Sequence, residues 1–311
     1  MARILVTGAN GFIGRHLCRR LAQDGAEVVA AVRRADAPDI DGIAARAVGD
    51  VGPGTDWTPL LAGVEAVVHC AARVHVLKES EPDPLAAFRK VNVAGTVRLA
   101  GQAAEAGVDR FVFLSSIGAR TAEAAAVRGA AAGPYQPSPY QQSKWEAEQA
   151  LTSIAAESGM ATVILRPPLV YGPGAPGNFR QLRRAIVRGW PLPLRSIDNR
   201  RSLIFVENLT SAILACLSHP QAPGHVFAVS DGEAVSTPRL AGLMAQALGR
   251  PARLLPCPPA LLRLALRLLR PGGAVEGLFE TLEIDNEEIR ERTGWRPPFA
   301  LPEALARSLA D

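Results

Sequence analysis

Cysteine is scarce in this chain, with four among 311 residues, at positions 18, 70, 216 and 257. No two of them have CxxC spacing, and the whole chain has only five histidines. The pattern argues against a disulfide framework and against a zinc site. We therefore expect reduced thiols, a cytoplasmic location and no bound metal.

Long apolar runs are also missing. None approaches the roughly 18 residues of a membrane span. The chain opens directly on a short apolar run at 3–8, without the longer apolar stretch and cleavage site of a signal peptide. The net charge is only +4 and no dense basic run occurs, so we expect no nucleic-acid partner and no integral membrane segment. This mild basicity, in which arginine far outnumbers lysine, suits small anionic ligands such as phosphates.

Strand-like and helix-like segments alternate through the first half of the chain. We expect strands at 4–7, 27–32, 64–70 and 110–115, and helices at 13–23, 84–106 and 141–158. Alternation of this kind predicts an α/β fold, a doubly wound parallel sheet with helices on both faces.

The sequence pattern changes after Leu165, where several prolines divide the chain into loops and short elements. Strand-like runs at 202–206 and 225–230 are expected to rejoin the main sheet. We therefore predict a nucleotide-binding domain over 1–170, completed by 201–231, and a smaller C-terminal substrate-binding lobe over 171–200 and 232–311. The Ala- and Gly-rich segment 120–134 is expected to form a surface loop.

Three glycines follow the first expected strand, namely Gly8, Gly11 and Gly14. Glycines between a strand and a helix allow a tight turn, close approach of the backbone to a pyrophosphate, and close helix–strand packing. The helix N-terminus adds free N–H groups and a positive dipole. The turn predicts a Rossmann-type dinucleotide site; the alternative is a purely structural turn.

The end of the second expected strand bears on the choice of cofactor. NAD enzymes usually place Asp or Glu there, to bind the ribose 2′-hydroxyl. This chain has Arg33 and Arg34, which would pair with a 2′-phosphate, so NADP(H) is favoured over NAD(H). The alternative is that both arginines are solvated surface residues. Asp50 would accept a hydrogen bond from the adenine amine, or cap a turn.

Tyr140 and Lys144 stand four residues apart at the start of an expected helix, which places them on one face. Tyrosine has a pKa of about 10, and a nearby ammonium would stabilise the phenolate and lower that pKa. The pair suits proton transfer to or from a substrate hydroxyl. Ser115 and Ser116 lie at the carboxyl end of the expected strand at 110–115, where a hydroxyl would orient the same substrate oxygen.

The whole set of motifs resembles the extended short-chain dehydrogenase/reductases that act on nucleotide sugars. The resemblance runs nearly the whole length of the chain. It is carried by segments 7–14, 49–50, 69–72, 91–96, 114–116, 140–144, 166–173, 200–206 and 294–295.

The resemblance implies a role for many single residues. Tyr140 would be the general acid–base, Lys144 the modulator of its pKa, Ser116 the third catalytic group and Asn92 a structural or relay asparagine. The substrate would be bound by Ser116, Tyr140, Asn178 and Arg201. The cofactor would be bound by Gly8, Asn10, Gly11, Phe12, Ile13, Gly14, Arg33, Arg34, Asp50, Val51, Ala71, Ala72, Tyr140, Lys144 and Pro167. A homodimer and a place in polysaccharide biosynthesis are further expectations.

Departures from the family pattern narrow the reaction. Ile117 and Gly118 replace the Asp-Glu pair that sugar-nucleotide dehydratases carry, so dehydration is not expected. The missing acidic residue after the second strand, and Leu169 where many epimerases have Asn, weigh against an epimerase. We therefore expect an NAD(P)-dependent oxidoreductase that reduces a 4-keto UDP-sugar. The alternatives are a UDP-sugar 4-epimerase of the UDP-glucose or UDP-N-acetylglucosamine type, and a non-catalytic NADP-binding regulatory module.

Two remaining features have competing interpretations. Segment 259–270 has a helical pattern of leucines with three arginines on one face. A lobe helix packed on the core or on a partner is favoured, and peripheral contact with a membrane surface is the alternative. His69 and His75 have no ligand partners at suitable spacing and are expected to be loop residues.

Overall fold

The computed structural model describes residues 1–74, 81–128, 137–269 and 278–310. Contacts divide the chain into two compact units. The first unit contains residues 1–167, 210–228 and 287–295, and the second contains 168–209, 229–286 and 296–311. Within the described residues, no helix is both long enough and apolar enough to span a bilayer.

A seven-stranded parallel sheet forms the centre of the first unit, in the order β3-β2-β1-β4-β5-β6-β9. The strands are β1 (Arg3–Thr7), β2 (Glu27–Val32), β3 (Ala45–Ala47), β4 (Ala66–His69), β5 (Arg110–Leu114), β6 (Ala161–Arg166) and β9 (Val226–Ala228). The strand order reverses between β1 and β4, and open α/β sheets bind ligands at the carboxyl ends of strands at such a reversal. The predicted Rossmann-type doubly wound sheet is confirmed.

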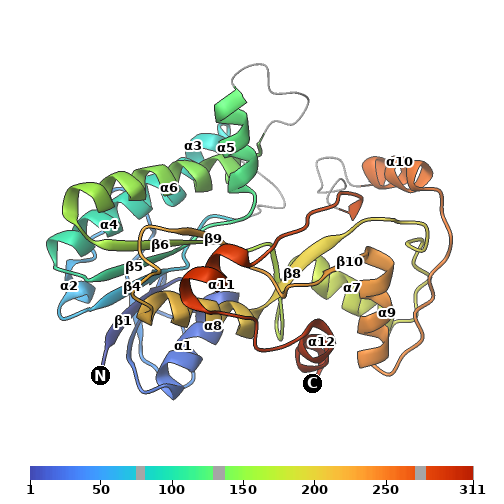
Figure 1. Ribbon diagram of the computed structural model, residues 1–311, viewed down its shortest axis with the longest axis horizontal. Helices are drawn as coiled ribbons and strands as arrows, with labels where there is room; N and C mark the ends of the chain where they lie inside the picture. Colours follow the sequence, from blue (N-terminus) through green and yellow to red (C-terminus); the bar gives the residue numbers. More distant parts are fainter. Residues whose placement is uncertain (75–80, 129–136, 270–277, 311) are drawn as a thin grey trace. The chain divides into compact units, whose positions relative to one another are not determined.

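Helices cover both faces of this sheet (Figure 1). One face carries α4 (Gly95–Glu105) and α6 (Pro139–Ser158), and the other carries α1 (Phe12–Gln23) and α8 (Val206–Ser218). Leu5, Phe111 and Ile164 of the strands pack with Leu99 and Leu151 of the helices in one buried cluster. The shorter helices are α2 (Thr58–Leu61), α3 (Pro84–Arg89), α5 (Ala119–Arg128) and α11 (Glu287–Thr293).

The second unit contains a small sheet in the order β10-β8-β7. Strand β8 (Arg201–Phe205) pairs in parallel with β7 (Leu169–Tyr171) and antiparallel with β10 (Ala234–Val235). Its helices are α7 (Gly177–Val187), α9 (Thr237–Ala247), α10 (Pro259–Leu269) and α12 (Leu301–Leu309).

The structure differs from three sequence expectations. The run at 202–206 does not rejoin the main sheet, because β8 pairs with β7 and β10, whereas the run at 225–230 does rejoin it as β9. Segment 119–128 is a helix rather than a loop, since alanine is the strongest helix former; 129–136 lie outside the described residues. The expected helix at 84–106 is interrupted by a π-helical turn, η1 (Lys90–Ala94).

Candidate active site

The glycine turn lies between β1 and α1, at the reversal of strand order. Gly8 has a φ of +64°, and a Cβ there would lie 2.9 Å from the Ala71 nitrogen. A Cβ on Gly14 would lie 2.2 Å from the Gly8 oxygen, so neither position accepts a side chain. Gly11 provides no side-chain cap for α1, and the first turn of α1 has no acidic residue. The first N–H groups of α1 are therefore available to a ligand at the turn. The glycine turn and these N–H groups form a cradle that fits a pyrophosphate.

A buried hydrogen-bond chain supports the turn from β4. The Thr7 hydroxyl accepts from the Ala71 N–H at 3.1 Å and lies 2.7 Å from His69 Nδ1. His69 Nε2 lies 3.1 Å from the Thr96 hydroxyl, which donates to the Asn92 carbonyl at 2.7 Å. Each hydroxyl has only one proton to donate, and that of Thr96 goes to the Asn92 carbonyl. The Thr96 oxygen therefore accepts from His69, which places the proton of the His69 ring on Nε2.

His69 is therefore not the loop residue that the sequence suggested. It is the last residue of β4 and is fully buried. Burial lowers the pKa of His69 to about 3, so its ring is neutral in the native state. His75 lies outside the described residues.

Asn92 connects the segment after β4 to the start of α6. Its side-chain oxygen accepts from the Arg73 N–H at 2.8 Å, and its nitrogen donates to the Arg73 carbonyl at 3.0 Å. The same nitrogen lies 2.9 Å from the Ser143 hydroxyl, which donates to the Tyr140 carbonyl at 2.8 Å. The hydrogen bonds thus run from the glycine turn to the backbone of Tyr140.

The predicted catalytic residues come together in the first unit. Tyr140 and Lys144 lie one turn apart at the start of α6, which a capping box between Ser138 and Gln141 begins. Ser116 follows β5, and its hydroxyl forms a hydrogen bond with Tyr140. The Phe88 ring lies edge-on to the Tyr140 ring, with centroids 6.1 Å apart.

Burial dominates the electrostatics of both α6 residues. It raises the pKa of Tyr140, and the hydrogen bond from Ser116 offsets only part of this rise. Lys144 is 2% exposed, and burial lowers the pKa of its ammonium to about 8. Its Nζ lies 4.2 Å from the centroid of the Phe113 ring. The expected lowering of the Tyr140 pKa by Lys144 is therefore not found in the protein alone.

Glu148, which sequence reasoning missed, is one turn beyond Lys144 and 1% exposed. Arg166, at the end of β6, pairs with it through an Nη2–Oε2 distance of 2.5 Å and an Nε–Oε1 distance of 3.0 Å. The Ser115 hydroxyl donates to the same carboxylate. The Glu148 carboxylate also opposes the lowering of the Lys144 pKa. The available signal was a Glu four residues after Lys144, at the spacing that shares a helix face.

The other predicted cofactor residues surround the same edge of the sheet. Arg33 and Arg34 follow β2 with side chains 69% and 73% exposed, in loose ion pairs with Asp50 at 3.9 Å and Asp36 at 3.2 Å. The Val51 side chain packs closely against the backbone of Gly95, where an added Cβ would lie 2.6 Å from Val51 Cγ1. Asn10, Phe12 and Ile13 belong to the turn and to the start of α1, Ala72 follows Ala71, and Pro167 is buried after β6.

The two predicted diphosphate ligands belong to the second unit. Asn178 is exposed in the first turn of α7. Arg201 begins β8 and donates to the Glu280 carbonyl at 3.1 Å, and burial lowers the pKa of its guanidinium. Their roles stay predictions. In the described parts of both units, no three potential metal-ligating side chains cluster.

Known proteins show the same architecture. Residues 4–230 match the model of the NAD dependent epimerase/dehydratase family. The chain is 41% identical to a UDP-glucose 4-epimerase from Vibrio cholerae, over 98% of this chain and 94% of that protein. Among solved structures, MoeE5 in complex with UDP-glucuronic acid and NAD aligns with a TM-score of 0.75 and 26% identity, covering 99% and 98% of the two chains. A UDP-glucose 4-epimerase from Thermotoga maritima has the same fold, with a TM-score of 0.75 and 23% identity over 99% and 97%. The chain therefore belongs to the NAD-dependent epimerase/dehydratase family.

Proposed function

We propose that this protein is a UDP-hexose 4-epimerase, which oxidises C4 of the sugar and reduces it again from the opposite face. The observation that carries the proposal is the hydrogen-bonded Ser116–Tyr140 pair, with buried Lys144 one helical turn away and the glycine cradle in the same unit. The near full-length similarity to a UDP-glucose 4-epimerase supports this reaction over the net reduction that the sequence first suggested.

In this mechanism Tyr140 handles the proton. Its phenolate takes the proton of the sugar 4-hydroxyl while the C–O bond gains double-bond character, and its hydroxyl returns the proton in the reverse step. Ser116, already bonded to Tyr140, holds the same oxygen. The mechanism requires the Lys144 ammonium to favour the phenolate once substrate and cofactor are bound, because in the protein alone burial raises the pKa of Tyr140. A nicotinamide, when bound, supplies a reversible acceptor for the C4 hydrogen.

The cofactor of this reaction would be held by the N–H groups at the start of α1 and by the backbone near Ala71. The family description and the NAD in the MoeE5 complex support NAD. Arg33 and Arg34 support NADP, since exposed ion pairs are weak and either guanidinium could turn to a 2′-phosphate.

Reduction of a 4-keto UDP-sugar is the second candidate, and the arginines at the end of β2 favour it. A reductase releases its product at a lower oxidation level and consumes one cofactor for each turnover. An epimerase consumes none.

The two candidates are separated by incubating the purified protein with UDP-glucose or UDP-N-acetylglucosamine, without added reductant, and resolving the products by anion-exchange chromatography. Epimerisation predicts interconversion with the C4 epimer up to a fixed equilibrium ratio. Failure with both sugars, together with stoichiometric NADPH oxidation on a 4-keto UDP-sugar, would establish the reductase instead.

Tyr140→Phe tests the catalytic assignment. Removing the phenol oxygen should lower turnover by about 10²- to 10⁴-fold, the usual contribution of a positioned acid–base group. The thermal unfolding temperature should stay within a few degrees of the unmodified protein, because the ring is retained. Unchanged turnover would show that another group moves the proton.

A further inference from the structure

One edge of the second unit is both basic and apolar. Residues 174–197 include five arginines and residues 234–269 include five more, and neither stretch contains Asp or Glu. Hydrogen bonds hold parts of the two stretches side by side: the Leu192 N–H donates to the Arg253 carbonyl and the Leu255 N–H to the Leu192 carbonyl, both at 2.8 Å.

Helix α10 continues this edge and has two different faces. Leu262 packs with Leu194 and Ile197 in a cluster that Leu266 also contacts. The other face presents Leu261, Leu264 and Leu268, which are 59%, 57% and 76% exposed. Their spacing of three and four residues aligns them in one stripe. The sequence expectation of a packed lobe helix therefore accounts for only one side of α10.

Exposed apolar and basic side chains continue from α10 along the neighbouring segments. Trp190 and Leu255 are half exposed, and the Arg188 guanidinium lies 5.2 Å from the centroid of the Trp190 ring. Arg195 and Arg253 are exposed and form no ion pair within the described part of the chain. The positive charge of these two arginines is thus not neutralised by a carboxylate of the described residues.

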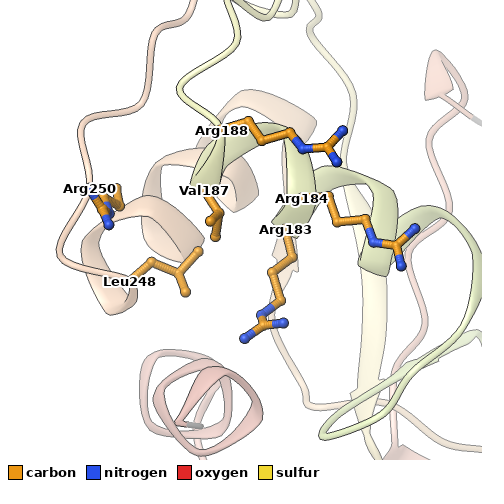
Figure 2. Close-up of a pocket in the computed structure, with 6 residues that line it drawn as sticks. All are labelled: Arg183, Arg184, Val187, Arg188, Leu248 and Arg250. Atoms are coloured by element: carbon orange, nitrogen blue, oxygen red, sulfur yellow. The ribbon is translucent and has the colours of Figure 1, made fainter.

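The arginines around the end of α7 indicate which kind of anion this edge would bind. Arg183, Arg184, Arg188 and Arg250 line a hollow of about 260 Å³ together with Val187 and Leu248. Figure 2 shows their guanidinium groups spreading in different directions around the two apolar side chains. Groups that spread in this way do not enclose one phosphate, but they suit negative charge distributed over a surface.

We propose that this edge, formed by residues 187–195, 250–255 and the exposed stripe of α10, docks the protein on an anionic lipid bilayer. The leucines of the stripe enter the boundary between headgroups and acyl chains, Trp190 lies at headgroup level, and the arginines pair with lipid phosphates. Charge complementarity favours this occupant, because the exposed Arg195 and Arg253, with Arg188 and Arg250, lie on segments without Asp or Glu and suit an extended layer of phosphates.

Vesicle flotation of the full-length protein tests the proposal. We expect it to float with phosphatidylcholine vesicles that contain phosphatidylglycerol, to bind phosphatidylcholine alone far more weakly, and to be released as added salt shortens the Debye length. Leu264→Asp/Leu268→Asp and, separately, Arg195→Glu/Arg253→Glu should each lower the partition coefficient by about tenfold or more.

The control is Arg46→Glu/Arg292→Glu, which makes the same charge change at exposed arginines of the first unit and should change partitioning less than threefold or so. No flotation of the unmodified protein, or equal losses in the control and edge variants, would overturn the proposal. So would leucine variants that keep vesicle binding but lose a dimer in light scattering, because the stripe would then be a contact between copies of the chain.

Discussion

Lys144 illustrates what the first unit does to a single side chain. In water its ammonium would be fully charged at pH 7, but here it is enclosed by Phe113, His69 and Cys70, and the lowered pKa of about 8 reflects lost hydration. The Glu148 carboxylate, one turn further along α6, opposes this lowering of the pKa. The sequence predicted the pairing of Tyr140 with Lys144 because helical spacing alone determines it.

The sequence did not predict how deeply Lys144 is buried or which carboxylate supports it. Ser115, Glu148 and Arg166 meet across β5, α6 and β6, so their contacts depend on tertiary packing rather than on local spacing. Asn92 was expected in a structural or relay role, yet its partners Arg73 and Ser143 could not be identified before the strand order was known.

Glu148→Gln tests the buried ion pair. The substitution leaves the Arg166 guanidinium buried without its main counter-charge, which typically costs about 3–5 kcal/mol. We expect the free energy of unfolding, measured with urea, to fall by that amount. Glu283→Gln is the matched control, because its pair with Arg200 is exposed and should contribute less than about 1 kcal/mol. Equal losses in the two variants would contradict a structural role for Glu148.

His69 predicts a pH dependence of stability. Its folded pKa of about 3 lies below the unfolded value of 6.5, so below pH 6.5 the unfolded chain binds a proton that the native state does not. Stability should therefore fall as the pH falls from 6.5 toward 3, by about 1.4 kcal/mol per pH unit from this residue. Urea unfolding between pH 7 and pH 4 should show a shallower fall in His69→Gln. Parallel pH profiles would contradict the assignment of a buried neutral ring.

At the scale of elements, hydrophobic periodicity and the glycine turn predicted most of the parallel sheet and its main helices. The prediction was wrong for β8, because a short apolar strand carries no signal that distinguishes one sheet from another. The loop prediction is also wrong for α5, because the segment is rich in alanine, which favours helix.

The β1–α1 junction gives a prediction at this scale. Gly14→Ala would place a Cβ 2.2 Å from the Gly8 oxygen, so the turn must shift and the affinity for a dinucleotide should fall by about tenfold or more. Gly101→Ala, in the middle of α4 with open space around its Cβ, should instead stabilise the fold by about 0.5–1 kcal/mol. Calorimetric binding of NAD and NADP to both variants checks this. Unchanged affinity in Gly14→Ala would place the dinucleotide elsewhere.

At the level of the whole molecule, one unit contains the glycine cradle and the Ser116–Tyr140 pair, and the other contains the basic edge and the predicted diphosphate ligands Asn178 and Arg201. The alternation of strand-like and helix-like segments correctly predicted an α/β fold. Of the two compact units, the second contains β8 and the first contains residues 287–295. The reaction was the least predictable property, since epimerases and reductases use the same catalytic residues.

Oxidation and re-reduction at C4 within one active site are tested most directly with UDP-glucose deuterated at C4. We predict that the C4 epimer forms with the deuterium still at C4, because the hydrogen leaves to the bound cofactor and returns without exchange with water. Formation of the epimer with hydrogen from solvent at C4, or no epimer at all from a protein that is loaded with cofactor, would contradict it.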